Sequence, residues 1–212
     1  MDNEEKKFGN LFPTGHIPII LTNIVQAGKT LRKKTPNEIE NRLTRRLCKK
    51  LNQLPPFRDG PLSIHPQQEI LSPDPDIDTP EGYIDILVSC EYGSEIYFAI
   101  EAKRLRVRST SGKGKMDAGN DEYVNKGMMR FVTGQYAPLM VTGAMLGYIF
   151  DGDIEKACSG VSGYIDSKIK ELKLIAPKKL SKSGILSSNE IYETRHNLKA
   201  RGFTLYHIFL SV

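Results

Sequence analysis

The chain has 212 residues, of which 39% are hydrophobic and 26% are charged. These proportions are typical of one folded domain of ordinary size and exclude a wholly disordered chain. No apolar run approaches the roughly 18 residues that a membrane span needs, and the N-terminal stretch lacks the apolar core of a signal peptide. The sequence therefore predicts a cytoplasmic protein with no membrane partner. Cys48, Cys90 and Cys158 are widely spaced and predict neither a disulfide framework nor a zinc site.

Basic residues outnumber acidic ones by 30 to 25, which leaves a net charge of +5. They gather in three clusters, within residues 29–34, 42–50 and 103–115. Clusters of this kind neutralise the phosphates of a nucleic acid, although a charge run on its own is more often a solvated face.

Prolines and glycines are scattered through residues 1–34, which predicts an irregular N-terminal lead-in. A single domain is expected at residues 35–212. We find no internal repeat.

The first firm helix is predicted to start after Thr35 and to run to about Leu54. Thr35 serves as its N-cap, and Glu38 completes a capping box. At a helical step of roughly 100° per residue, Ile39 and the following leucines form one apolar arc. Glu40 falls inside that arc, where a carboxylate is costly without a partner. Glu40 is therefore a candidate site residue, although a glutamate that reaches water from the edge of the arc explains its position equally well.

A β-hairpin is predicted from residues 83–88 and 96–103, two apolar runs separated by a turn at residues 91–94. One short strand is expected before it, within residues 61–71. The proline-rich stretch at residues 72–80 predicts a loop.

The remaining pattern predicts a helix at residues 121–136, a buried strand at 144–150, a helix at 153–173 and a final strand at 203–210. The order is helix, strand, strand, strand, helix, strand, followed by an added C-terminal helix and strand. We expect an α/β fold with a mixed central sheet flanked by helices.

Asp85, Glu101 and Lys103 are the only charged residues within the two hairpin strands. Glu101 and Lys103 lie two residues apart and share one face of their strand, and pairing across the hairpin brings Asp85 to the same edge. Two carboxylates, with the backbone carbonyl of Ala102 as a further ligand, suit Mg²⁺ or Mn²⁺. Lys103 adds a cation that orients or deprotonates a water. The alternative is an ordinary Glu–Lys pair on a solvated edge strand.

Asp85 in the segment GYIDI, and Glu101 with Lys103 in the segment AIEAK, resemble the motif of the PD-(D/E)XK nuclease superfamily. Ile84 stands where the motif has proline, a tolerable change because the proline binds no metal. The resemblance covers about residues 36–150 and implies a restriction-endonuclease-like αβββαβ core. It also implies that Asp85 and Glu101 hold the metal, that Lys103 serves the nucleophilic water, and that Glu40 assists directly or through water.

Further side chains are predicted to contact nucleic acid, either because they follow the motif in a basic cluster or because they lie on the next helix. They are Arg104, Arg106, Lys113, Lys115, Arg130 and Gln135. His196 and His207 are each compatible with a DNA-facing or a core position.

These features predict a Mg²⁺-dependent DNA endonuclease, and the resemblance suggests a role in restriction or anti-phage defence. Cutting both strands of a duplex favours a homodimer, and a partner protein would supply specificity, since no separate recognition domain is visible. Two alternatives remain: a catalytically inactive nucleic-acid-binding or assembly module of the same fold, and a repair or recombination exonuclease. RNA is the less favoured substrate.

Overall fold

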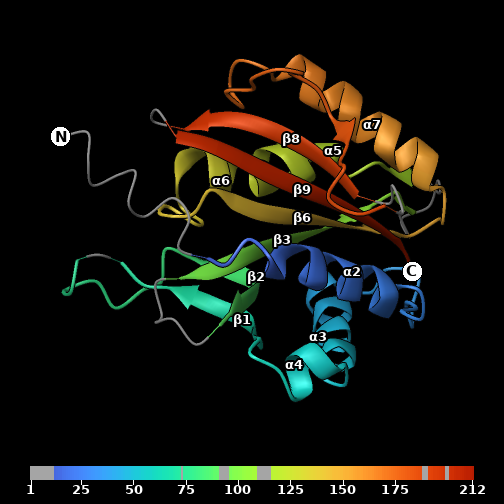
Figure 1. Cartoon of the computed structure of the whole chain (residues 1–212). Coiled ribbons are helices and arrows are strands. Elements are labelled where there is room, and N and C mark those ends of the chain that lie inside the picture. The colour runs from blue at the N-terminus through green and yellow to red at the C-terminus, as the bar shows by residue number, and fades with distance from the viewer. Residues whose placement is uncertain (1–11, 73, 91–95, 109–115, 188–190, 199–200) are drawn as a thin grey trace.

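The computed structural model describes residues 12–72, 74–90, 96–108, 116–187, 191–198 and 201–212, with a seven-stranded sheet at the centre (Figure 1). The strands run across it in the order β1-β2-β3-β6-β9-β8-β7. β6 is parallel to both of its neighbours, and all other neighbours are antiparallel. The strands are β1 (Ser63–Ile70), β2 (Gly82–Ser89), β3 (Tyr97–Leu105), β6 (Thr142–Ile149), β7 (Ser181–Lys182), β8 (Ile191–Leu198) and β9 (Arg201–Ser211), with a separate pair β4 (Val107–Arg108) and β5 (Met116–Asp117). The predicted α/β class with a mixed central sheet is confirmed.

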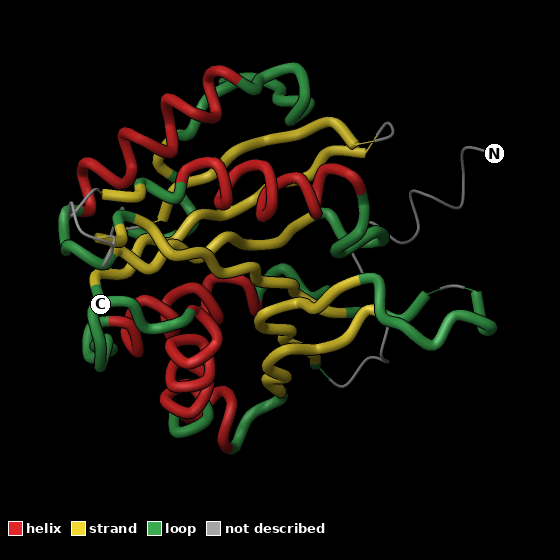
Figure 2. The backbone as a smooth tube through the Cα atoms, turned by 180° about the vertical axis from the view of Figure 1, so that it is seen from behind, coloured by secondary structure: helices red, strands yellow, loops and turns green. Residues whose placement is uncertain are grey.

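Helices cover both faces of the sheet (Figures 1 and 2). α2 and α3 pack on one face, against β9 and against β1 to β3 respectively, while α5, the segment η1, α6 and α7 lie on the other face. No helix in the described part of the chain has both the length and the apolar character needed to cross a membrane. The helices are α2 (His16–Gly28), α3 (Glu40–Leu51), α4 (Pro55–Arg58), α5 (Asn120–Tyr123), the π-helical η1 (Val124–Met128), α6 (Met129–Thr133) and α7 (Ile154–Ser167).

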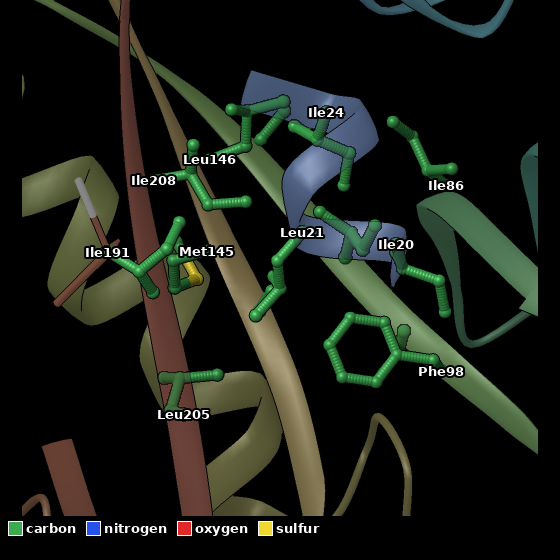
Figure 3. Close-up of a cluster of buried hydrophobic side chains, with 14 of the residues drawn as sticks. Ile20, Leu21, Ile24, Ile86, Phe98, Met145, Leu146, Ile191, Leu205 and Ile208 are labelled. Carbon is green, nitrogen blue, oxygen red and sulfur yellow. The ribbon is translucent and has the colours of Figure 1, made fainter. Parts of the chain in front are cut away.

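The core is built on both sides of the central strands (Figure 3). On one side, the fully buried Ile20, Leu21 and Ile24 of α2 face the sheet. Removing this apolar surface from water, at about 25 cal/mol per Å², is the main force that holds α2 in place. The sheet residues of the cluster in Figure 3 include Ile86, Phe98, Met145, Leu146, Ile191, Leu205 and Ile208.

The irregular structure predicted for residues 1–34 is wrong for residues 16–28, which form α2. The glycines and prolines that suggested a loop lie at the ends of this helix or in its first turn, where they are tolerated. Gly28 also lets α2 approach β9, because an added Cβ would lie 2.5 Å from Leu210. Residues 1–11 lie outside the described part of the chain.

The predicted start of the first helix is also wrong, because α3 begins at Glu40 and ends at Leu51. Glu38 does not form a capping box: its buried carboxylate accepts hydrogen bonds from Arg46 at 2.5 and 2.7 Å and from the backbone N–H of Lys34 at 2.7 Å. The hydrogen bond from Arg46 lowers the pKa of Glu38 to about 2. The Glu38 carboxylate is therefore used in a bidentate charged pair and is not available to cap the helix.

Among the described residues after β6, the C-terminal addition consists of one helix and three strands, not the predicted helix and strand. The sequence did not predict β8, because its buried positions include the polar residues Thr194 and His196 and the strand therefore lacks an apolar pattern. α7 ends at Ser167, before the predicted end at residue 173. The predicted helix at 121–136 is present as α5, η1 and α6, which end at Gly134 in a left-handed conformation (φ 83°).

Candidate active site

The strands β2 and β3 stop pairing next to Asp85. Their pairing runs from Ser89 and Tyr97 to Ile86 and Ile100. Asp85 follows, and its carboxylate accepts the backbone N–H of Ala102 at 2.8 Å. β2 continues beside β1 and β3 continues beside β6. The Asp85 side chain thus takes the place of a backbone acceptor in the β2–β3 hydrogen-bond ladder. Polar groups can gather where the two strands diverge.

Gln67 of β1 holds the other oxygen of Asp85. Its Nε2 donates to Oδ1 of Asp85 at 2.7 Å, and its own Oε1 accepts from Asn41 at 2.9 Å, so the orientation of the amide is set from both sides. The β1–β2 register places Gln67 opposite Asp85, and its φ is 55°, in the left-handed region. Such a backbone costs of order 1–3 kcal/mol in a non-glycine residue and is often found at functional sites. Sequence analysis missed Gln67, because nothing local distinguishes a glutamine in an exposed strand.

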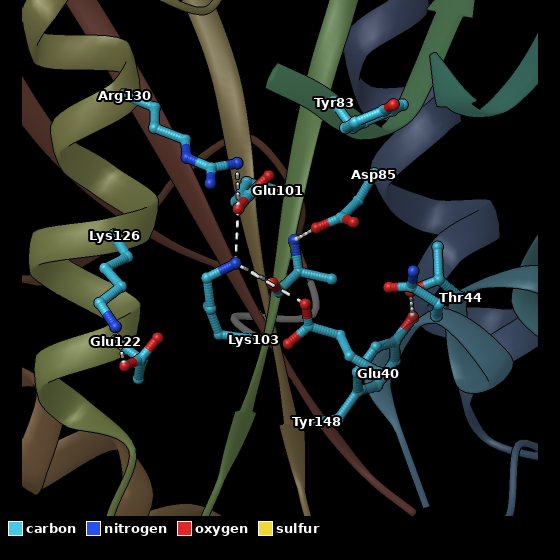
Figure 4. Close-up of polar contacts among 12 residues, drawn as sticks. Glu40, Thr44, Tyr83, Asp85, Glu101, Lys103, Glu122, Lys126, Arg130 and Tyr148 are labelled. Carbon is cyan, nitrogen blue, oxygen red and sulfur yellow. Dashed lines mark hydrogen bonds and ion pairs between the residues drawn. The ribbon is translucent and has the colours of Figure 1, made fainter. Parts of the chain in front are cut away.

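Lys103 lies at the centre of the cluster (Figure 4). Its Nζ is 2.5 Å from Oε1 of Glu101, 2.9 Å from the carbonyl oxygen of Ala102 and 3.6 Å from Oε1 of Glu40. Glu101 and Lys103 come from the same face of β3, as predicted. Glu40 reaches Lys103 from the first residue of α3, so the structure brings all four predicted catalytic residues together.

Burial and repulsion from Asp85 raise the pKa values of both glutamates in this cluster. Burial, followed by the charge of Asp85, raises the pKa of Glu101 to about 8. Burial also raises the pKa of Glu40 to about 7, with Lys103 lowering it and Asp85 raising it. Burial acts to lower the pKa of Lys103, but Glu101 and Glu40 outweigh it and the pKa is raised. The two glutamates therefore flank the ammonium group of Lys103, and Asp85 adds repulsion to both of them.

One oxygen of Glu101 is buried without a partner. The side chain is only 1% exposed, and among the described residues its Oε2 has no hydrogen-bond partner. An unpaired buried carboxylate oxygen costs stability, so it is a feature that function, rather than folding, explains.

Arg130 lies on the opposite side of Glu101 from Glu40 (Figure 4). Its Nη1 is 3.2 Å from Oε1 of Glu101 and also donates to the hydroxyl of Tyr136, which in turn donates to the carbonyl of Tyr83. The guanidinium stands over the Tyr136 ring at 5.2 Å, and a third of the side chain is exposed. Arg130 follows the π-helical η1, a feature frequent at functional sites.

A groove of about 760 Å³ adjoins the cluster on the side of Glu40 and Lys103. Arg104 and Arg108 contribute to its lining, which places two residues of the third basic cluster beside the site. The full lining is Asn37, Ile39, Glu40, Asn41, Lys103, Arg104, Val107, Arg108, Asp117, Gly119 and Glu122.

The other described side chains predicted to contact nucleic acid have partners outside the cluster. Arg106 pairs with Asp151 at 2.6 Å, and Gln135 donates to the carbonyl of Glu81 at 2.8 Å. Lys113 and Lys115 lie outside the described residues. Contact of these side chains with DNA stays a prediction.

The two histidines are core residues. His196 and His207 are fully buried, and both ring Nε2 atoms contact the hydroxyl of Thr194, at 2.8 and 2.9 Å. His196 Nδ1 lies 2.7 Å from the carbonyl of Leu172, and His207 Nδ1 lies 3.0 Å from the hydroxyl of Tyr123. Burial lowers the pKa of His196 to about 4 and that of His207 to about 3. Both are therefore neutral at pH 7 and tie α5 to β8 and β9.

The oxygen atoms of this cluster are the type of ligand that a divalent cation such as Mg²⁺ prefers. Asp85, Glu101 and Glu40 offer hard oxygen ligands, Ala102 offers a carbonyl, and the unpartnered oxygen of Glu101 is of the same chemistry. Among the described residues, no three His, Cys, Asp or Glu side chains form a group that could hold a metal ion as they stand. The ammonium of Lys103 lies among these oxygens instead.

Comparison of the chain with protein-family models, with curated proteins and with solved structures finds no match.

Proposed function

We propose that the chain is a metal-dependent hydrolase of DNA phosphodiester bonds, centred on Asp85, Glu101 and Lys103. The observation that carries this proposal is a buried carboxylate at the point where β2 and β3 separate. One buried oxygen of Glu101 has no partner within the described residues, and burial together with the charge of Asp85 raises the pKa of Glu101 to about 8 even though Lys103 and Arg130 lie beside it.

The order of elements supports the resemblance to the PD-(D/E)XK superfamily. When the one-turn α4 and the short β4–β5 pair are set aside, the described elements from α3 to β6 follow the order helix, strand, strand, strand, helix, strand. The motif residues lie where β2 and β3 diverge. Our proposal therefore includes a restriction-endonuclease-like core and a role in restriction or anti-phage defence.

Asp85, Glu101 and the carbonyl of Ala102 would hold Mg²⁺ or Mn²⁺, with Glu40 assisting. The bound ion would activate water and neutralise charge at phosphorus. Lys103 keeps its proton because Glu101 and Glu40 raise its pKa, and it would orient the attacking water or stabilise the charge that develops. Gln67 and the Ala102 N–H hold Asp85 in position.

Arg130 would bind a non-bridging phosphate oxygen. One third of its side chain is exposed, and its hydrogen bond to Tyr136 fixes the guanidinium beside Glu101. A guanidinium placed this way presents paired N–H donors that match phosphate geometry.

A purely structural role explains the cluster less well. A buried ion-pair network is often no more stable than apolar side chains of similar volume, and a buried carboxylate oxygen without a partner adds a further cost. The raised pKa of Glu101 means that the charged carboxylate opposes folding.

The test is cleavage of plasmid and of end-labelled DNA with Mg²⁺ or EDTA. The proteins are wild type, Asp85→Asn, Lys103→Met and a control, Lys168→Met, which removes a surface lysine paired with Glu171. We expect cleavage that needs Mg²⁺, survives in the control and falls by at least about 100-fold in the two site variants.

Three outcomes separate the alternatives. Cleavage that persists in Asp85→Asn would refute the site. DNA binding that is equal with and without metal and comes with no cleavage would indicate the inactive binding module. Loss of linear but not covalently closed substrate would indicate an exonuclease.

A further inference from the structure

Tyr83 is an exposed aromatic residue beside the cluster. It lies two residues before Asp85 in β2, so both side chains project from the same face, about 7 Å apart along the strand. The side chain is 44% exposed. Its backbone is fixed, because the Tyr83 carbonyl accepts the hydroxyl of Tyr136. An exposed ring on a rigid strand is a platform that is ready before any ligand binds.

The Tyr83 ring and the groove that contains Arg104 and Arg108 lie on different sides of the carboxylate cluster (Figure 4). The groove with Arg104 and Arg108 includes Glu40 and Lys103. Tyr83 lies on the other side of Asp85 from Glu40 (Figure 4). A strand that leaves the groove and crosses the carboxylates would therefore meet Tyr83 next.

The charge around Tyr83 favours an uncharged group. Its cross-strand partner in β1 is the exposed Glu69, and Asp85 follows on the same face. Two carboxylates disfavour a phosphate at this position, whereas carboxylate oxygens accept hydrogen bonds from the amino groups of bases. Arg130 lies on the side of Glu101, with which it pairs, and the Tyr83 side chain remains 44% exposed (Figure 4).

We propose that Tyr83 is the stacking platform of a base-binding subsite next to the cleavage centre, and that this subsite selects DNA with an unpaired base beside the scissile phosphate. The proposal rests on the proposed function and names its substrate class. Every base has a π-face, so stacking on tyrosine tolerates any sequence.

An unpaired base is required for a physical reason. Inside a duplex both faces of each base are covered by its neighbours, and a protein ring reaches a face only at an end or after the base is flipped out. Single strands, overhangs and frayed ends present free faces at no such cost. A centre that cuts one unpaired strand also needs no second copy of the chain.

The experiment measures stacking and cleavage separately on the full chain. A 12-nucleotide single-stranded DNA carrying 2-aminopurine and a blunt duplex of the same sequence are titrated in EDTA, and fluorescence quenching and anisotropy are followed. The proteins are wild type, Tyr83→Phe, Tyr83→Ala and Ile175→Ala, a control that removes another exposed apolar side chain. The same DNAs are then cleaved in Mg²⁺.

We expect wild type and Tyr83→Phe to quench 2-aminopurine and to bind the single strand alike. Tyr83→Ala should lose the quenching and bind the single strand on the order of 10-fold more weakly, with duplex binding unchanged. The control should match wild type. In Mg²⁺, the single strand should be cut faster than the blunt duplex by wild type, and Tyr83→Ala should remove this preference.

The results keep the two proposals apart. Tyr83-dependent quenching without cleavage in Mg²⁺ supports the subsite and refutes hydrolysis. Metal-dependent cleavage that is equal on both DNAs and unaffected by Tyr83→Ala refutes the subsite and supports hydrolysis. Equal weakening in Tyr83→Phe and Tyr83→Ala, or in the control, also refutes stacking as the cause.

Discussion

Replacing Glu101 by glutamine should make the metal-free protein more stable. Glutamine has nearly the shape of a protonated glutamate, so the substitution removes only the charged form. The pKa of Glu101 is raised from 4.5 to about 8, mainly by burial. Between these values the folded state holds a proton that the unfolded state has lost, so Glu101 lowers the free energy of unfolding as the pH rises from 4.5 to 8.

The size of the effect follows from the same two values. Each pKa unit corresponds to 1.36 kcal/mol, so at pH 7 the variant should be more stable by about 3 kcal/mol, and at pH 5 by about 1 kcal/mol. For a chain of 212 residues this is a rise in Tm of about 6–12 °C at pH 7. Urea unfolding in EDTA at pH 5, 6 and 7 measures the difference directly.

The control for this experiment is Glu171→Gln, which changes an exposed glutamate paired with Lys168. Its effect should stay within about 0.5 kcal/mol at every pH. If Glu101→Gln is no more stable than wild type at pH 7, or if its effect does not change with pH, the cluster is not charge-strained. The main physical support for a metal site would then be lost.

The remaining predictions concern the support of the site and the core. Gln67→Ala should weaken Mn²⁺ binding 10- to 100-fold in a calorimetric titration, because Asp85 loses one of its two hydrogen-bond donors; an unchanged affinity would contradict the positioning role of Gln67. Mg²⁺ at 100 times its Kd should stabilise wild type by about 2.7 kcal/mol in thermal unfolding but leave Asp85→Asn unchanged; equal shifts would place the ion elsewhere. Gly119→Ala should destabilise the fold by more than about 2 kcal/mol in urea, because φ is 71° and the new Cβ would lie 2.3 Å from a backbone oxygen; a neutral effect would mean that this turn rearranges freely. The pKa values of His196 and His207 are lowered, so the unfolded state takes up protons as the pH falls below about 6.5. In the Glu40→Gln/Glu101→Gln background, which removes the opposing trends of the two glutamates with raised pKa values, unfolding at pH 5 should need about 4 kcal/mol less than at pH 7; a flat profile would refute the burial of the histidines as neutral rings.

The sequence alone determined the parts of this protein that depend on neighbouring residues. Strand parity placed Glu101 and Lys103 on one face, and the short connection between two apolar runs made a hairpin that brought Asp85 to them. The mixed α/β class followed from the order of periodic segments. These features depend on residues that are close in the sequence, so the pattern of side chains is enough to predict them.

Only the tertiary structure decided the rest of the site. The β1–β2 register set Gln67 opposite Asp85, and the packing of α6 on the sheet brought Arg130 to Glu101. Glu38 pairs with Arg46 eight residues ahead in place of capping the helix, and α3 begins at Glu40, which lies 3.6 Å from Lys103. Contacts between distant segments depend on how whole surfaces fit together, and no local pattern records that fit.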